Sequence, residues 1–150
     1  AKRDWGHSKD YVNAIWKILQ HKEPDDFVIA TGDTHSVREF VAEAAKNLDY
    51  EIIWKGKGLK EQGIDKKSGK VLIEVDPIFF RPNEVAYLQG DSSKARKLLN
   101  WEPKETFQSL AKLMIEADLQ YAEEEMRSHH PIISQKRYSI NGGRKKRQRN

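Results

Sequence analysis

The chain has 150 residues, of which 37% are hydrophobic and 33% charged, a composition typical of a single soluble domain. Cysteine is absent, which excludes disulfide scaffolds, thiolate zinc sites and cysteine nucleophiles. The longest apolar runs are far shorter than the about 20 residues that a membrane span needs, so we expect no membrane partner. Without a charged-then-apolar leader, the cytosol or the nucleus is the expected compartment, and we predict a cytoplasmic protein.

The net charge of +4 is unevenly distributed. Residues 136–150 contain seven Lys or Arg and no acid, which leaves 20 basic and 23 acidic residues in positions 1–135. A nucleic-acid-binding face would spread basic side chains over the folded part. The concentration of charge in a terminal run therefore argues against nucleic acid as a partner.

The first half of the chain predicts helices and one short strand. Apolar residues recur at helical spacing over 9–21, with Ser8 or Asp10 as the expected N-cap and Pro24 beyond the end. FVIA at 27–30 predicts a buried strand. Ser36 and Glu39 have the spacing of a capping box, which predicts a second helix from there to about Leu48.

Two further strands are predicted at 51–54 and 70–75, separated by a polar loop with four glycines. The loop resembles a nucleotide-binding loop only in part. Gly58 and Gly63 have the spacing of a phosphate loop, but Ile64 and Asp65 follow where Lys and then Ser or Thr are required. An ordinary surface connection is the favoured interpretation.

The last part of the chain predicts a short helix that ends at Asn100 and a long amphipathic helix that begins at Thr106. Asp91 or Ser92 is the expected N-cap of the short helix. Helical periodicity stops near Met126, so we expect a domain at 1–126 and a basic, flexible tail at 127–150. The strands and helices together predict an α/β fold.

The five histidines show no metal-ligand spacing, so we predict no metal site. His7 is the most interesting of them because of its place in RDWGHSKD, and a packing or hydrogen-bonding role is favoured over catalysis.

Two arginines are candidate anion ligands. Arg3 lies just before a helix start, where it can share a phosphate with the helix amides; a surface salt bridge with Asp4 or Asp10 is the alternative. Arg81 lies between Phe80 and Pro82, which restrict its direction, and a planar guanidinium can bind a phosphate through two hydrogen bonds.

Glu84 follows Arg81 by three residues and has two possible roles. It can neutralise Arg81, or it can accept hydrogen bonds from sugar or ribose hydroxyls, since an ionised carboxylate offers only acceptors.

Five segments in order resemble the C-terminal part of the GDP-mannose 4,6-dehydratase family. They are AKRDWGHSKDYV, DDFVIATGDTHSVREFV, KVLIEVDPIFFRPNEV, LQGDSSKARKLLNWEPK and TFQSLAKLMIEADL, and the similarity covers about residues 1–125. The paired motifs RDWGH and FRPNEV are specific to that family among extended short-chain dehydrogenases.

The resemblance implies a two-part lyase of GDP-fucose biosynthesis, in which an N-terminal Rossmann domain binds NADP and carries the catalytic residues. The chain then corresponds to the C-terminal lobe that closes over GDP-mannose, in an enzyme expected to be a homo-oligomer. By resemblance, Arg3 and Arg81 match the pyrophosphate-binding arginines, Glu84 the carboxylate at the ribose, and Val37 a residue beside the base.

The chain departs from the family in what it lacks. It has no G-x-x-G-x-x-G, and none of its five tyrosines has a lysine four residues later, so we predict no catalytic residue in it. We expect either a fragment of a longer dehydratase or a truncated product, inactive alone. The alternative function is a non-catalytic interaction module whose basic tail binds an acidic partner.

Overall fold

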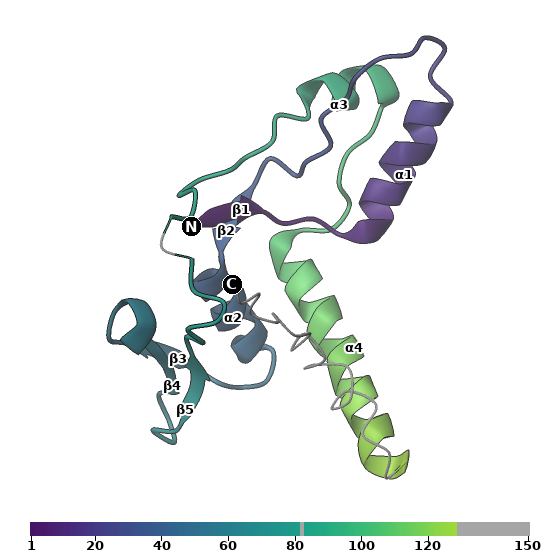
Figure 1. Ribbon diagram of the computed structural model, residues 1–150. Helices are drawn as coiled ribbons and strands as arrows, with labels where there is room; N and C mark the ends of the chain where they lie inside the picture. The colour runs from purple at the N-terminus through teal and green to yellow at the C-terminus, as the bar shows by residue number, and fades with distance from the viewer. Residues whose placement is uncertain (82, 129–150) are drawn as a thin grey trace, which may run out of the picture. The chain divides into compact units, whose positions relative to one another are not determined.

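The computed structural model describes residues 1–81 and 83–128, which form helices and short strands (Figure 1). The elements are β1 (Lys2–Asp4), α1 (Ser8–Leu19), β2 (Thr34–Ser36), α2 (Val37–Lys46), β3 (Ile52–Lys55), a 3₁₀ turn η1 (Gly58–Lys60), β4 (Gln62–Asp65), β5 (Val71–Glu74), α3 (Ser93–Leu99) and α4 (Phe107–Ser128). This mixed composition confirms the predicted α/β class. The chain divides into two compact units, Ala1–Ile115 and Glu116–Asn150.

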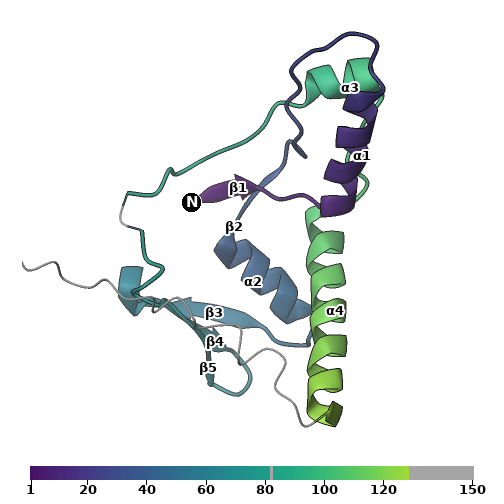
Figure 2. The same cartoon turned by 45° about the vertical axis from the view of Figure 1, so that its right-hand side comes forward.

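The core of the first unit lies where α1, α3 and the following chain meet. Trp101 is 2% exposed, and it packs with three small or aliphatic side chains, Ala14 of α1 and Ala95 and Leu99 of α3. Figure 2 shows α1 and α3 side by side. Alanines at the crossing allow the two helices to approach closely, and partly buried side chains surround them: Tyr11, Ile18, Phe27 and Ile29.

Helix α1 begins one residue before the predicted start, and its N-cap is neither Ser8 nor Asp10. His7 caps it: the Nδ1 atom accepts the backbone N–H of Lys9 at 3.1 Å. The hydrogen-bonding role expected for His7 is thereby confirmed.

Asp10 is instead buried, at 6% exposure, and fixes the connection that leads into α4. Its carboxylate accepts the backbone N–H groups of Lys104 and Glu105 at 3.0 and 3.1 Å. Its backbone carbonyl accepts the indole N–H of Trp101 at 3.0 Å. A prediction of Asp10 as a cap could not foresee this, because the partners lie more than 90 residues away in sequence.

The opposite face of α1 carries an apolar stripe at positions i, i+3, i+4 and i+7. Its members are between 57% and 75% exposed: Val12, Ile15, Trp16 and Leu19. The apolar residues that predicted α1 therefore lie on two faces of the helix, and only one of these faces contributes to the core.

The predicted strand at 27–30 is wrong, because this segment is irregular and belongs to no sheet among the described residues. Its apolar side chains are nevertheless used, since Phe27 and Ile29 pack against the Trp101 core. Ala30 is 5% exposed, and the chain at Gly90 passes so close that a Cβ there would lie 2.3 Å from the Ala30 Cβ. A short apolar run predicts burial more reliably than it predicts a ladder.

Strands β1 and β2 form an antiparallel ribbon of three pairs, in which Arg3 faces His35 and Lys2 faces Ser36. The sequence pattern missed both strands, because three residues are too few to show alternation. Trp5 extends the link by donating its indole N–H to the His35 carbonyl at 2.8 Å. The Trp5 ring stacks on Phe40 at 4.8 Å, and His35 stacks on Phe107 at 3.6 Å.

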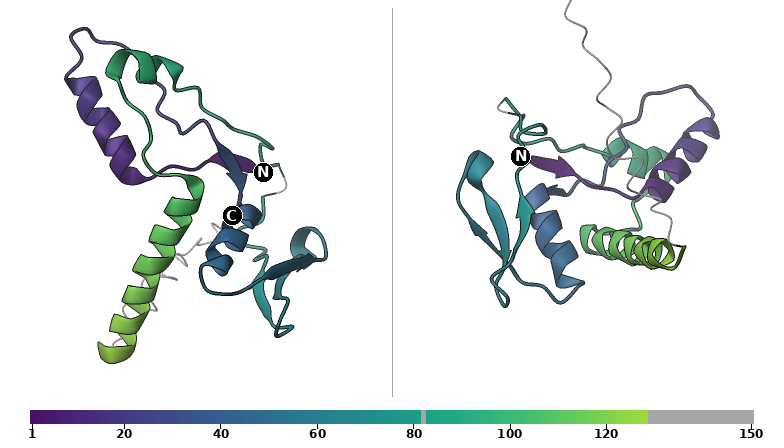
Figure 3. Two further views of the ribbon diagram at one scale, coloured as in Figure 1. Left: turned by 180° about the vertical axis from the view of Figure 1, so that it is seen from behind. Right: turned by 60° about the horizontal axis from the view of Figure 1, so that its bottom comes forward.

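The strands β3, β4 and β5 form an antiparallel sheet in chain order (Figure 3). Strands β3 and β5 confirm the predictions at 51–54 and 70–75, but β4 lies within the segment interpreted as a loop. Gly63 of β4 leaves room for its neighbours, since a Cβ there would lie 3.0 Å from the Ile73 Cβ. Helix α2 approaches this sheet through Arg38, whose guanidinium lies 5.3 Å from the Trp54 ring centroid.

Four helix ends follow their sequence patterns. Ser36 and Glu39 form the predicted capping box at the start of α2, and Asn100 takes the left-handed conformation, with φ of 47°, at the end of α3. Thr106 caps α4 by accepting the Ser109 N–H at 3.1 Å. At the start of α3, the Asp91 carboxylate accepts the Ser93 N–H at 2.9 Å.

Helix α4 continues beyond the predicted end at Met126 to Ser128. In its part within the second unit, Arg127 and Glu123 form an ion pair at 3.4 Å, one helical turn apart. The predicted tail beyond Ser128 lies outside the described residues. Across residues 1–81 and 83–128, no helix has the length and apolar character that crossing a bilayer demands.

Candidate anion-binding site

The candidate site is built on β1, which has a second neighbour besides β2. The Lys2 N–H donates to the Ala86 carbonyl at 2.8 Å, and the Leu88 N–H donates to the Lys2 carbonyl at 3.1 Å. The segment that follows FFRPNEV therefore runs parallel to β1. This pairing brings the motif around Arg3 and the motif around Arg81 together, although about 80 residues separate them.

Three contacts hold the Arg3 guanidinium. Its Nη1 atom donates to the Lys2 carbonyl at 2.7 Å and to the Val85 carbonyl at 2.8 Å, while Nη2 forms an ion pair with the Glu84 carboxylate. Arg3 therefore forms an ion pair, but the partner is Glu84 and not Asp4 or Asp10, which the sequence analysis considered. Because two backbone carbonyls fix the guanidinium, its direction is set before any ligand binds.

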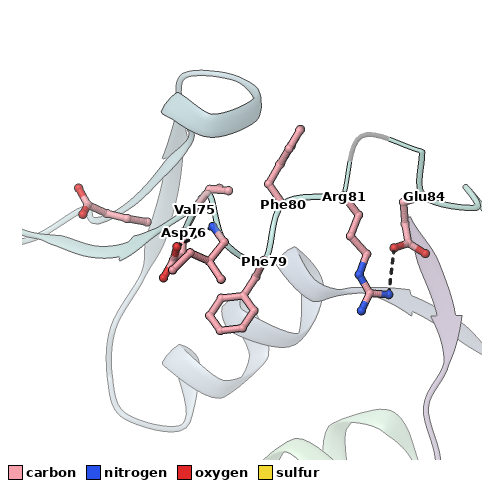
Figure 4. A pocket seen from close by; sticks show the side chains of 8 residues that line it. Val75, Asp76, Phe79, Phe80, Arg81 and Glu84 are labelled. Atoms are coloured by element: carbon pink, nitrogen blue, oxygen red, sulfur yellow. Dashed lines mark hydrogen bonds and ion pairs between the residues drawn. The ribbon is translucent and has the colours of Figure 1, made fainter. Parts of the chain in front are cut away.

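Arg81 reaches the same carboxylate from the other side. Its Nη1 atom lies 3.9 Å from the Glu84 Oε2 atom, and Figure 4 shows the two side chains pointing toward each other. The Arg81 side chain is 82% exposed, against 32% for Arg3. The predicted residues Arg3, Arg81 and Glu84 therefore converge, with the carboxylate between the two guanidinium groups.

A cavity of about 610 Å³ opens beside this cluster. Its lining combines charged and apolar side chains: Glu74, Val75, Asp76, Ile78, Phe79, Phe80, Arg81 and Glu84. Phe79 is 70% exposed, so an aromatic surface lies next to the arginine. A planar, partly apolar ligand that carries an anionic group matches this combination of side chains.

Val37, the fourth predicted residue, is the first residue of α2 and is 65% exposed. It follows Ser36, the partner of Lys2 in the ribbon, so it lies near the end of the strand that carries Arg3. Strand pairing thus brings Val37 to the neighbourhood of the cluster.

Asp4 is a residue of this region that the sequence analysis mentioned only as a possible ion-pair partner. Its carboxylate accepts the Thr31 N–H and hydroxyl at 2.8 and 2.7 Å and the Gly32 N–H at 2.8 Å. Gly32 has a φ of 81°, so the turn needs a residue that tolerates this conformation. The sequence signal for this contact is the TGD turn after an apolar run, because turn amides often donate to a carboxylate.

Lys2 and Glu39 add a second charged pair on the ribbon, with 3.4 Å between the Lys2 ammonium and the carboxylate. Hydrogen bonds from Ser36, followed by the Lys2 ammonium, lower the pKa of Glu39 from 4.5 to about 2. Glu39 therefore stays ionised under all physiological conditions, and it stabilises the start of α2 next to Val37.

The side chains of the cluster suit the binding of phosphate and hydroxyl groups. Two guanidinium groups offer planar donors for phosphate, and a carboxylate offers acceptors for hydroxyls. Residues 1–81 and 83–128 contain no group of three or more His, Asp or Glu side chains that could hold a metal ion.

A family model described as GDP-mannose 4,6 dehydratase matches residues 1–114, which include every residue of the cluster. The chain belongs to the GDP-mannose 4,6-dehydratase family. A relative from Drosophila melanogaster named GDP-mannose 4,6 dehydratase is 55% identical over 120 residues, which are 80% of this chain and 30% of the relative. A relative of the same name from Homo sapiens is 52% identical over 80% of this chain and 32% of its own length.

A relative from Vibrio cholerae named GDP-mannose 4,6-dehydratase extends the match to 94% of this chain at 42% identity, and to 39% of its own length. The chain thus spans about a third of the length of the curated dehydratases it matches. Membership of the family confirms the resemblance seen in the five sequence segments.

Proposed function

We propose that the chain is the substrate-binding, C-terminal portion of a GDP-mannose 4,6-dehydratase. The observation that carries the proposal is the convergence of Arg3 and Arg81 on one carboxylate beside an open cavity. The family supplies a substrate with this chemistry, because GDP-mannose contains a pyrophosphate for the guanidinium groups and a ribose for Glu84. Val37 is proposed to lie beside the base.

The reaction proposed for the complete enzyme is an internal redox dehydration. NADP would supply the hydride acceptor and donor for this reaction, which converts GDP-mannose to GDP-4-keto-6-deoxymannose, a precursor of GDP-fucose, with loss of water. The residues of this chain bind and orient the nucleotide. NADP and the catalytic groups belong to the part of the dehydratase that this chain does not span, so residues 1–150 alone are proposed to be inactive.

The proposal is tested by GDP-mannose affinity, measured by calorimetry on the full-length dehydratase that contains this chain. Arg3→Ala removes a fixed, charge-assisted contact worth on the order of 1.5 to 3 kcal/mol, so the dissociation constant should rise roughly tenfold to a hundredfold. Arg81→Ala should act toward the lower end of that range, because this exposed side chain must lose more freedom when it binds. Arg81→Lys should recover only part of the loss, since an ammonium lacks the planar fork.

Arg127→Ala provides a matched control, because this arginine is 79% exposed and pairs with Glu123 on α4. Neither this variant nor deletion of residues 128–150 should change the affinity. Normal binding by Arg3→Ala and Arg81→Ala, together with loss of binding in the deletion variant, would refute the proposal. That result would favour the alternative module whose basic tail binds an anion.

A further inference from the structure

The anion site depends on the register between β1 and the segment 84–88, which begins with Glu84. Two backbone hydrogen bonds join these chains in the described part of the protein, and both belong to Lys2. In this register the Arg3 guanidinium reaches the Val85 carbonyl at 2.8 Å and the Glu84 carboxylate. A slip of two residues would move both acceptors by about 6.6 Å, since a parallel strand rises about 3.3 Å per residue. A pairing this short leaves the register weakly specified by itself.

The turn at residues 31–33 is a shared anchor for the two chains. From the side of β1, the Asp4 carboxylate accepts the Gly32 N–H at 2.8 Å. From the other side, the side-chain amide of Gln89 donates to the Gly32 carbonyl. The N–H and the carbonyl of one turn residue are therefore held by β1 and by the residue that directly follows the segment 84–88. A slip between the two chains would break the Gln89 contact.

A second hydrogen bond orients the Gln89 amide. The Tyr87 hydroxyl donates to the Gln89 Oε1 atom at 2.7 Å, and the Nε2 atom donates to Gly32. Tyr87 is also the residue of the segment that pairs with Lys2 of β1. The amide thus connects the pairing partner of β1 to the turn that β1 already holds.

We propose that Gln89 is a positioning residue of the anion site, because it fixes the register in which Arg3 meets the segment 84–88. The inference rests on the proposed function of the site. Neither Gln89 nor Tyr87 lines the cavity in the described part of the chain, so the effect on a ligand passes through Arg3. Without the register, the guanidinium loses two of its three fixed acceptors, and a bound phosphate has to order it again at a cost in affinity.

The test is a double-mutant cycle on the full-length dehydratase that contains this chain, with GDP-mannose affinity measured by calorimetry. Gln89→Met keeps the length of the side chain but cannot donate. The dissociation constant should rise roughly twofold to tenfold, as expected for the loss of one neutral hydrogen bond. In the Arg3→Ala background the same substitution should change it by less than about 1.5-fold, because no guanidinium is left to position.

Gln120→Met is the matched control, since Gln120 also uses its amide as a donor, to Glu124 of the same helix at 3.0 Å. It should leave the affinity unchanged in both backgrounds. Tyr87→Phe should weaken binding less than Gln89→Met, because the amide keeps its donor and loses only the hydroxyl that orients it. A greater loss in Tyr87→Phe than in Gln89→Met would overturn the assignment of the positioning role to Gln89.

Two further results would overturn the inference. An unchanged dissociation constant in Gln89→Met would show that the register does not need this amide. An equal loss with and without Arg3 would show a general effect on stability instead of positioning. In either case, weakened binding by Arg3→Ala leaves the proposed function standing, whereas normal binding by Arg3→Ala removes the proposed function and this inference together.

Discussion

Replacing Asp10 with alanine should loosen the connection between α3 and α4 more than any surface change in the same helix. The substitution leaves the Lys104 and Glu105 amides without the carboxylate that accepts both at 3.0 and 3.1 Å. Two charge-assisted bonds are worth on the order of 1.5 to 3 kcal/mol each, but the freed amides gain access to water. We therefore expect a net loss of about 2 to 3 kcal/mol in the local opening free energy.

Native-state hydrogen exchange on the full-length protein measures this loss directly. The Lys104 and Glu105 amides should exchange roughly 30 to 150 times faster in Asp10→Ala, by the conversion of about 1.4 kcal/mol per tenfold. Asp10→Asn should lie between the two proteins, because an amide oxygen still accepts but carries no charge. An increase below about threefold in Asp10→Ala would refute the view that this carboxylate holds the connection.

Two smaller predictions concern the ribbon and the segment beside it. Protonation of Glu39 should remove its stabilising contacts; since its folded pKa is about 2 against 4.5, the contribution is complete above pH 4.5 and disappears toward pH 2. A carbon-detected NMR titration should find a midpoint near 2, and Glu39→Gln should abolish this part of the acid sensitivity; a midpoint near 4.5 would contradict the capping geometry. Gly90→Ala should destabilise by about 1 to 3 kcal/mol in urea unfolding, because the new Cβ meets that of Ala30. Ala30→Gly in the same chain should restore part of the loss, and independent, additive effects would show that the two segments do not touch.

Helix ends were predictable because their chemistry is local. The Ser36–Glu39 box and the left-handed Asn100 both depend on residues within one turn of the helix. The N-cap of α1 was wrong for an instructive reason. His7 is an uncommon cap, while Asp10, one of the two predicted caps, is buried in the core.

Strands were harder to predict than helices because their partners are remote. FVIA has the composition of a strand but finds no ladder in the described chain, whereas the three residues of β1 have no strand pattern and pair on both sides. The convergence of Arg3 and Arg81 depends on those pairings, so spacing alone could not have shown it. The family resemblance indicated that both arginines belong to one site, and the structure shows that both approach the Glu84 carboxylate. Their role in substrate binding stays a prediction.

Helix α1 has one buried face and one exposed apolar face, so a ligand of the exposed face can change the stability of the core. One face carries Asp10 and Ala14 into the core, and the other presents Trp16 and its apolar neighbours to solvent. A surface that binds the stripe binds only the folded helix, so by mass action it stabilises the Asp10 and Trp101 contacts without touching them. The melting temperature of this part of the chain should accordingly rise with the occupancy of any surface that binds the stripe.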